Sequence, residues 1–363
     1  MANFKPLKII DWYIIKKFIG TYFFVILLLI SIIVIIDFNE RLDKFIRNGA
    51  PISAILLDYY PNFILYFANL FSPLFVFISV IFFTSRLADR SEIIAMLSSG
   101  MSFHRLMLPY MISATFIALI TFSLNSYVIP PSNITRNNFQ NKYVRDWSVT
   151  YSNNIQLEVE PGIIAYFDNF NSTTKTGNRF SLERFEGKEL KSRLTAKTIV
   201  WDTLYHWTIK DYLIRDFVGM KEEITLGQSL DTTLTIIPSD FMISINDAEQ
   251  MITPALKTYI DRQKKRGVGN IQLFEIEYHR RFAMTMAAFI LTIIGASVSA
   301  RKVKGGMGMK IGLGLLLSFA YILFMQVSSS FAVNGYMSVW MAIWVPNIVY
   351  LFIAGALYMK APR

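Results

Sequence analysis

The chain has 363 residues, of which 53% are hydrophobic, and a formal net charge of +10 at pH 7. It contains no Cys, which excludes disulfide bridges and thiolate metal sites. A basic balance of this size can indicate nucleic-acid binding, but the apolar excess points first to a membrane protein with positively charged cytoplasmic flanks.

Six apolar segments, three near each end of the chain, each approach the roughly 20 residues that cross a bilayer core. They are Phe18–Ile36, Pro61–Thr84, Leu106–Val128, Phe282–Ala300, Ile311–Ala332 and Met341–Met359. None of them contains Asp, Glu, Lys, Arg or His. Because charge inside a membrane usually marks an ion or proton path, its absence predicts a membrane protein driven by another protein. The first run is too long for a cleavable signal peptide.

Charges between the spans predict the orientation. Basic residues outnumber acidic ones before span one, after span two and after span four, and the chain ends on a basic tail. Since basic residues concentrate on the cytoplasmic side, both termini are expected in the cytoplasm and the long polar insert in the periplasm. Arg280 and Arg281 lie at the outer start of span four, against this bias. Glu275 and Glu277 nearby offset their charge.

The predicted organisation is helices one to three over residues 1–128, a periplasmic domain over 129–269, and helices four to six over 270–363. Pro130 and Pro131 are expected to end span three, because Pro cannot continue a helix. Alternation and β-branched or aromatic content then predict strands over Ile155–Glu160, Ile163–Phe167, Phe180–Phe185, Leu190–Thr195, Thr198–Trp201, Trp207–Phe217 and Leu230–Ile236. Such spacing indicates an antiparallel sandwich or jelly roll, with either an ordinary core or a lipid-conducting interior.

A short helix is predicted to close the insert. Thr253 is a suitable N-cap and Pro254 suits the first helical position. Leu256 and Ile260 share one face, and Gly267 provides a stop. The basic residues 264–266 lie either near the outer membrane surface or at a solvated helix end. The expected fold class is an α-helical integral membrane protein with six transmembrane helices (3+3) and an inserted all-β, jellyroll-like domain.

The sequence lacks a recognisable catalytic or metal-binding constellation. Gly305–Lys310 lacks the spacing and hydroxyl of a phosphate-binding G-x-x-x-x-G-K-[ST] loop. His104, His206 and His279 are scattered, without an H-E-x-x-H pattern, and no G-x-S-x-G elbow occurs. We therefore expect no catalytic residues, no metal and no cofactor, and a subunit that is not an enzyme.

The loop between spans two and three, residues 86–100, predicts a short amphipathic helix. The helix and its flank contain Arg86, Arg90, Ser91, Glu92, Ile93, Met96, Leu97 and Gly100. The three apolar members recur at i, i+3 and i+4 and form one face, the Ser is the expected N-cap, and the Gly is the expected stop. This helix is expected to dock into a partner's groove; the alternative is a helix lying in the lipid interface.

Residues 90–100 (Arg-Ser-Glu-Ile-Ile-Ala-Met-Leu-Ser-Ser-Gly) resemble the coupling-helix motif of the lipopolysaccharide export permeases, the LptF/LptG or YjgP/YjgQ family. Four further strings resemble that family in the same order over essentially the whole chain. They are Ile10–Ile14 ahead of span one, Asn125–Pro130 at the exit from span three, Glu277–Phe282 at the start of span four, and Trp344–Asn347 in span six. The front part and the helix that closes the insert resemble the G-type subunit more than the F-type.

The resemblance implies a permease subunit of the bacterial inner membrane. Together with a second related permease subunit and cytoplasmic ATPase subunits, it would extract lipopolysaccharide and pass it to a periplasmic bridge or bitopic jellyroll protein. The coupling residues, from Arg90 to Gly100, would meet the ATPase. No nucleic-acid partner is implied.

Lipid A combines phosphates with acyl chains, so its permease needs cations at the outer rim and an apolar wall, here expected from spans one, two, five and six. Arg41, Lys44 and Arg47 follow span one and are the candidate phosphate-binding residues. The alternative is ordinary pairing with nearby acidic residues. Some family members carry a Lys within span one where this chain has Val34, which moves the expected phosphate contact outward.

Other functions would explain the same segments. A non-transporting membrane scaffold or sensor with a periplasmic β domain needs no lipid path, and lipid capture inside the β domain would distinguish the two. A lipid-modifying enzyme is disfavoured because the chain lacks a catalytic constellation, and a proton-driven transporter because the spans lack charge.

Overall fold

The computed structural model describes residues 8–144, 151–171, 174–219, 221–238, 245–265, 271–300 and 306–361. The chain divides into two compact units. Unit 1 comprises Met1–Val144, Glu249–Thr253 and Glu275–Arg363, and unit 2 comprises Arg145–Ala248 and Pro254–Phe274. The basic loop at residues 301–305 and the predicted helix stop Gly267 lie outside the described residues.

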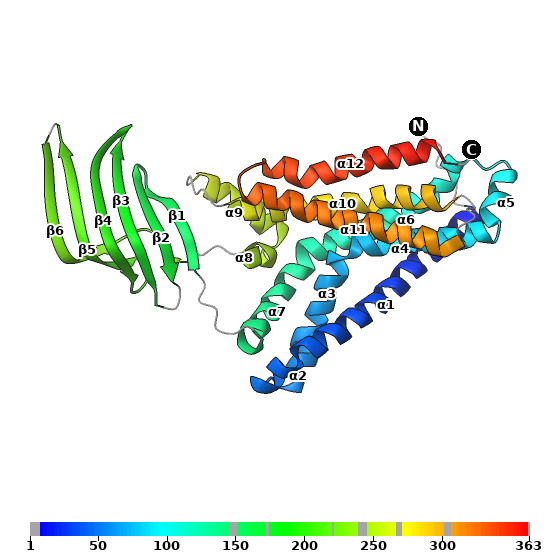
Figure 1. The fold of residues 1–363 in the computed structure, drawn as a ribbon, viewed down its shortest axis with the longest axis horizontal. Coiled ribbons are helices and arrows are strands. Elements are labelled where there is room, and N and C mark those ends of the chain that lie inside the picture. Colours follow the sequence, from blue (N-terminus) through cyan, green and yellow to red (C-terminus); the bar gives the residue numbers. More distant parts are fainter. Residues whose placement is uncertain are drawn as a thin grey trace. The chain divides into compact units, whose positions relative to one another are not determined.

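Six helices in the described part of the chain are long and apolar enough to cross a membrane, which confirms the predicted number of spans. The second of them, Ser72–Asp89, covers only the later part of the predicted Pro61–Thr84. They are Ile9–Arg47 (α1), Ser72–Asp89 (α4), Phe103–Tyr143 (α6, η2 and α7 in succession), Gln272–Ser299 (α10), Ile311–Val333 (most of α11, Gly306–Val333) and Val339–Met359 (α12). Figure 1 shows α10, α11 and α12 running alongside α4 and α6.

The third span continues through Pro130 and Pro131, so its predicted end there is wrong. Helix α6 (Phe103–Ser123) passes into a π-helical turn, η2 (Leu124–Val128), and then into α7 (Ile129–Tyr143). A Pro interrupts a regular helix because it lacks an N–H group and its ring clashes with the carbonyl four residues earlier. The π turn places the prolines in the first turn of α7, where the missing N–H is tolerated.

The second span is broken into pieces. Helix α2 (Ile52–Ala54) and the π turn η1 (Ile55–Tyr59) lead into α3 (Tyr60–Leu70). Phe71, with φ −93° and ψ 8°, separates α3 from α4, and Pro73 stands in the first turn of α4. The chain therefore changes direction between α3 and α4, since these backbone angles leave the helical region.

Helix α4 joins the front and back halves of unit 1. One side contributes Phe75 and Val80 to an apolar core shared with α1 and α6, and the other contributes Phe77 and Ile81 to a core shared with α10, α11 and α12. Helix α11 approaches closely, because a Cβ atom on Gly314 would lie 2.1 Å from Ile81 Cδ1. Helix α4 therefore packs against α1 and α6 on one side and against α10, α11 and α12 on the other.

Unit 2 contains one antiparallel sheet of six strands, arranged in chain order (Figure 1). Its strands are β1 (Tyr151–Glu160), β2 (Ile163–Asn171), β3 (Thr176–Glu186), β4 (Glu189–Trp201), β5 (His206–Val218) and β6 (Lys221–Thr233). Phe167, Phe170, Phe180 and Trp207 form the centre of its core, and Trp207 Nε1 donates to the Ile236 carbonyl at 3.0 Å. The predicted all-β insert is confirmed.

The largest differences from the predicted strand boundaries are in β4 and β6. Leu190–Thr195 and Thr198–Trp201, predicted as separate strands, both belong to β4. The first part of β6, residues 221–229, is mostly exposed, and this includes its two apolar residues, Ile224 and Leu226. An edge strand that buries neither face gives only a weak alternating signal, and only the end of β6 was predicted.

Two short helices follow the sheet, α8 (Ile245–Gln250) and α9 (Thr253–Lys265). Leu256 and Ile260 are buried on one face of α9, and the Tyr259 ring lies 4.7 Å from that of Phe274. The predicted closing helix and its apolar face are confirmed.

Candidate functional site

The loop between α4 and α6 contains the predicted helix, α5 (Glu92–Ser98). Ser91 precedes it with a left-handed φ of 60°, and its side chain makes no capping hydrogen bond, so its predicted role as N-cap is wrong. An N-cap Ser normally has an extended backbone, which turns the hydroxyl towards the free N–H groups. The Ser91 N–H instead donates to the Ala88 carbonyl at 3.0 Å, beyond the last turn of α4.

Gly100 follows the end of α5, as predicted. Its φ is +84°, a conformation that favours Gly. The Met101 N–H donates to the Met96 carbonyl at 3.3 Å, the long bond of a Schellman motif. Ser102 then caps α6, because its hydroxyl accepts from the Arg105 N–H at 3.2 Å.

The apolar face predicted to dock into a partner packs against the chain's own core. Ile93 is 1% exposed in the core of α1, α4 and α6, and Met96 and Leu97 are half-buried against it. Ile94 is 48% exposed on another side of α5. A partner that binds α5 from outside therefore meets Ile94 before it meets Ile93.

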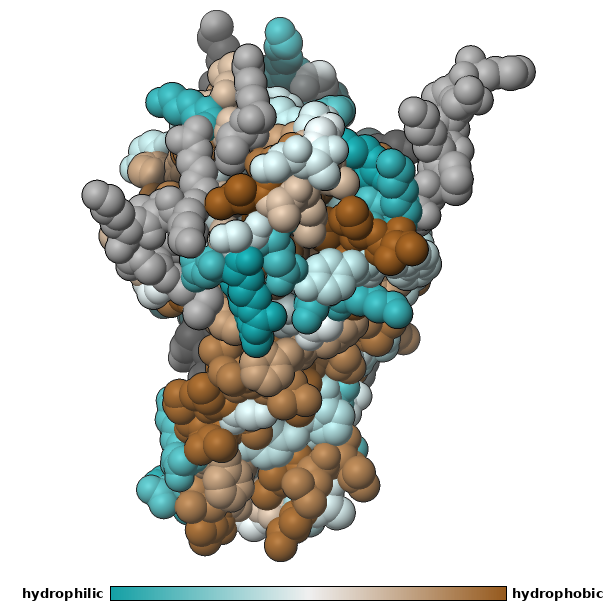
Figure 2. Space-filling view, turned by 90° about the vertical axis from the view of Figure 1, so that its right-hand side faces the viewer, coloured by the Kyte–Doolittle hydropathy of each residue, from teal (hydrophilic) through white to brown (hydrophobic). Residues whose placement is uncertain are grey.

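The surface around α5 is polar and accessible. Arg90 is exposed beyond the end of α4. The start of α1 and the end of α12 lie at this end of unit 1 (Figure 1). Figure 2 faces this end and shows hydrophilic side chains gathered on it, while hydrophobic surface dominates the lower part of the view. Such a surface suits a water-soluble partner.

The start of α1 holds both α5 and α6. The Tyr13 hydroxyl donates to Glu92 Oε2 at 2.9 Å. Arg105 makes a bidentate pair with Asp11, at 2.7 Å from Nη1 and 2.6 Å from Nη2, and Asp11 is 1% exposed. Sequence reasoning found neither contact, because the partners are 79 and 94 residues apart.

The candidate phosphate-binding residues lie near the other end of α1. Arg41 Nε donates to Asp37 Oδ1 at 2.6 Å, and the Tyr59 hydroxyl donates to Asp37 Oδ2 at 2.9 Å. Asp37 is 7% exposed, so the alternative of pairing with a nearby acid holds for Arg41. Lys44 is half-buried and Arg47 exposed in the last turn. The structure places all three cations on one helix.

An apolar pocket of about 710 Å³ lies beside these cations, formed by α1, α2, η1 and α3. Its lining is Val34, Ile35, Phe38, Leu42, Phe45, Ile46, Ala50, Ile52, Ile55, Leu56 and Tyr60. Tyr60 alone among these residues carries a polar side-chain atom. The pocket suits an apolar ligand.

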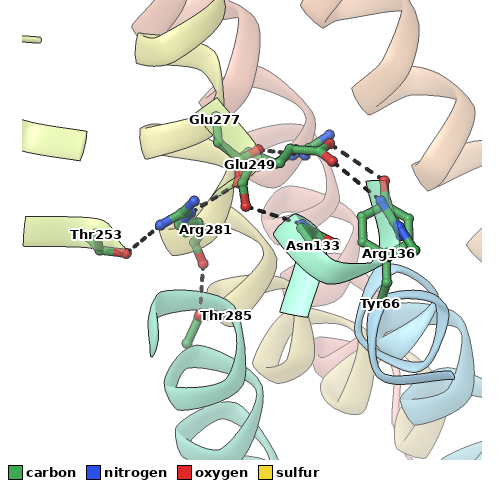
Figure 3. Close-up of polar contacts among 9 residues, drawn as sticks. Tyr66, Asn133, Arg136, Glu249, Thr253, Glu277, Arg281 and Thr285 are labelled. Atoms are coloured by element: carbon green, nitrogen blue, oxygen red, sulfur yellow. Dashed lines mark hydrogen bonds and ion pairs between the residues drawn. The ribbon is translucent and has the colours of Figure 1, made fainter. Parts of the chain in front are cut away.

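A buried ionic cluster lies among α3, α7, α8 and α10 (Figure 3). Glu249 on α8 is 8% exposed and accepts from Arg280 Nη2 at 3.0 Å. Arg136 on α7 lies 4.0 Å from the same carboxylate, and its Cζ lies 3.6 Å from the centre of the Tyr66 ring. Asn133 Nδ2 donates to the Glu249 backbone carbonyl at 3.1 Å. Glu249 therefore ties its segment to α7 and α10 of unit 1.

Glu277 forms the second centre of this cluster. It pairs with Arg280 and accepts from Arg281 Nε at 2.9 Å. Arg281 Nη1 also donates to Thr253 Oγ1 at 2.9 Å (Figure 3). Glu277 is 4% exposed and Arg281 1%. The expectation that Glu277 offsets the charge of Arg280 and Arg281 is confirmed. The site is buried, so an unpaired charge there would be costly.

Among the described residues, no group of three or more His, Asp and Glu side chains is placed to hold a metal ion. A family model described as "Lipopolysaccharide export system permease LptF/LptG" matches residues 12–360. The search of curated proteins gave no match to the chain.

Proposed function

Because the chain belongs to the LptF/LptG family of lipopolysaccharide export system permeases, we propose that it is one permease subunit of an ATP-driven exporter. It would extract lipopolysaccharide from the inner membrane and pass it to a periplasmic β-jellyroll bridge. The family is a non-catalytic transmembrane component of lipopolysaccharide export. The six long apolar helices agree with a multi-pass protein of the inner membrane.

The apolar pocket beside α1 is the observation that carries this proposal. A hydrocarbon chain gains by leaving water for an apolar wall, and this wall contains a single residue with a polar side-chain atom, Tyr60. The volume of about 710 Å³ falls within the roughly 300–1,000 Å³ of small-ligand sites. The pocket therefore suits one or more acyl chains of lipid A.

Cations next to the pocket support a phosphorylated lipid. Asp37 accepts from the Arg41 guanidinium, and the Tyr59 hydroxyl donates to the other oxygen of Asp37 and fixes that carboxylate. A guanidinium carries five N–H donors, so a pairing with Asp37 leaves donors that can bind a phosphate. Lys44 and Arg47 follow on the same helix. We propose that these three residues bind lipid A phosphates.

The partners are proposed from the family and from the surface at α5. Cytoplasmic ATPase subunits would bind at Arg90, Glu92 and Ile94, and a second related permease subunit would complete the passage. This assignment makes the α5 end cytoplasmic, with both termini, and unit 2 periplasmic. Within the family, the chain resembles the G-type subunit more than the F-type.

Photocrosslinking tests the lipid site. A benzoylphenylalanine at Leu42, inside the pocket, is expected to capture lipopolysaccharide in cells, and mass spectrometry of the adduct identifies the lipid. The matched position is Phe24, which is 58% exposed on α1 and does not line the pocket. There the same probe is expected to capture ordinary phospholipids, because an exposed apolar side chain of a membrane helix faces bulk lipid.

Comparing the probes at Leu42 and Phe24 distinguishes a specific lipid-binding pocket from a nonspecific apolar surface. If Leu42 and Phe24 capture the same lipids in the same proportions, the pocket is not a lipopolysaccharide site. A third probe at Glu40, exposed on the polar face of α1, measures background capture.

A further inference from the structure

Tyr13 is the residue through which α1 reaches the coupling segment. Its hydroxyl donates to Glu92 Oε2 at 2.9 Å, across 79 residues of chain. Both side chains are half-buried, so the bond is only partly screened by water. The bond engages one carboxylate oxygen of Glu92, and the second oxygen remains a potential acceptor for a cation of a partner.

The start of α1 is anchored independently of this bond. Asp11 makes its bidentate pair with Arg105 at the start of α6 and accepts from the Lys8 N–H at 2.7 Å. Helix α5, by contrast, has seven residues and packs through Ile93, Met96 and Leu97. The Tyr13 hydroxyl therefore adds a polar link to α5 at a place where α1 is already fixed to α6.

Helix α1 is continuous from this link to the pocket. It runs through 39 residues as one α-helix. Tyr13 and Arg41 are 28 residues apart in sequence, which at 1.5 Å per residue is about 42 Å along the helix axis. No proline or π turn interrupts α1 between these two points, so it lacks the usual cause of a kink that would absorb a displacement. Movement of Glu92 therefore has a direct path to the helix that lines the pocket.

We propose that Tyr13 is a positioning residue that orients the Glu92 carboxylate and links α5 to α1, so that work done on α5 by an ATPase reaches the lipid pocket. This inference rests on the proposed function. Tyr13 makes no contact with lipid or nucleotide in this scheme; it acts through Glu92.

The test compares Tyr13→Phe with the unaltered protein in the complex that it forms with its ATPase and second permease subunit. Phe preserves the ring, including its packing under Lys17 Nζ at 5.6 Å, and removes only the hydroxyl. We expect lipid released per ATP hydrolysed to fall about fivefold, the factor that corresponds to one hydrogen bond of about 1 kcal/mol. The ATPase is expected to remain bound, and the melting temperature is expected to fall by no more than a few degrees, the shift that about 1 kcal/mol produces.

A matched control is Tyr358→Phe. The Tyr358 hydroxyl is bonded to His104 Nδ1 at 2.8 Å, at the start of α6, so this variant also loses one tyrosine hydrogen bond near the same end without touching Glu92. The Tyr358→Phe complex is expected to release as much lipid per ATP hydrolysed as the unaltered complex. In a Glu92→Gln background, Tyr13→Phe is expected to add little, because both changes weaken the same contact.

The outcomes separate the two claims. If the unaltered complex fails to move lipid on adding ATP, the proposed function is wrong. If it moves lipid and Tyr13→Phe keeps the full ratio, or Tyr358→Phe lowers the ratio as much, the role of Tyr13 is wrong. Fully additive effects of Tyr13→Phe and Glu92→Gln also overturn it.

Discussion

Glu277→Gln is expected to lower the free energy of unfolding of unit 1 by about 3–5 kcal/mol, the usual cost of removing one partner from a buried ion pair. Glu277 is 4% exposed and lies between Arg280 and Arg281. Gln keeps the size of the side chain and removes the charge. Arg281, which is 1% exposed, then loses its carboxylate partner in a place that water does not reach.

Unfolding in detergent, followed by fluorescence or by the fraction that stays monodisperse, measures this loss. The matched control is Glu40→Gln, the same substitution at an exposed site of unit 1, with an expected change below about 0.5 kcal/mol. Adding Arg281→Met to Glu277→Gln is expected to recover part of the stability, because it removes the stranded charge. Equal shifts for Glu277→Gln and Glu40→Gln would show that the cluster is not stabilising.

Ile94→Asp is expected to abolish co-purification of the ATPase while the chain remains folded. Ile94 is 48% exposed on α5, so a carboxylate there stays hydrated in the free protein. At an interface the same carboxylate is desolvated, and a lost apolar anchor costs about 2 kcal/mol or more of binding. A carboxylate in its place adds the cost of its own desolvation, and the complex is expected to dissociate on purification.

Ile93→Asp is the matched variant on the neighbouring residue. Ile93 is 1% exposed within the core of α1, α4 and α6. Removing its packing and burying a carboxylate are expected to cost about 3 kcal/mol or more of stability, visible as aggregation or a lowered melting temperature. Retention of the ATPase by folded Ile94→Asp protein would exclude this side of α5 as the docking surface.

The membrane spans were predictable because their signal is local. Each segment without charge is long enough to cross a bilayer by itself, and a window of apolar residues such as Ile311–Ala332 identifies it without knowledge of its neighbours. The closing helix at Thr253 was predictable for the same reason, since its cap, its proline and its apolar spacing lie within a few residues of one another.

Local rules failed where a neighbouring turn altered them. Pro130 breaks a regular helix, but the π turn Leu124–Val128 moves it into a first helical turn. Ser91 has the side chain of an N-cap but a left-handed backbone. Residue type alone predicts a helix end at Pro130 and an N-cap at Ser91. The backbone conformation of the adjoining residues prevents both.

The amphipathic pattern at α5 was read correctly as one apolar face, but periodicity does not say what that face meets. Ile93, Met96 and Leu97 turned out to pack inside the chain. A helical period reports that one side avoids water, and both the chain's own core and a partner's groove satisfy that condition.

By itself, the sequence determined the number of spans, the β insert, the short helix α5 and the family resemblance, because hydropathy, alternation and short motifs act over a few neighbouring residues. Only the tertiary structure decided that Tyr13 bonds Glu92, that Asp11 pairs with Arg105, that Glu249 joins Arg136 and Arg280 in a buried ionic cluster, and that α1 borders an apolar pocket. Those features join residues tens to hundreds of positions apart, and which distant side chains meet depends on how whole helices pack against one another.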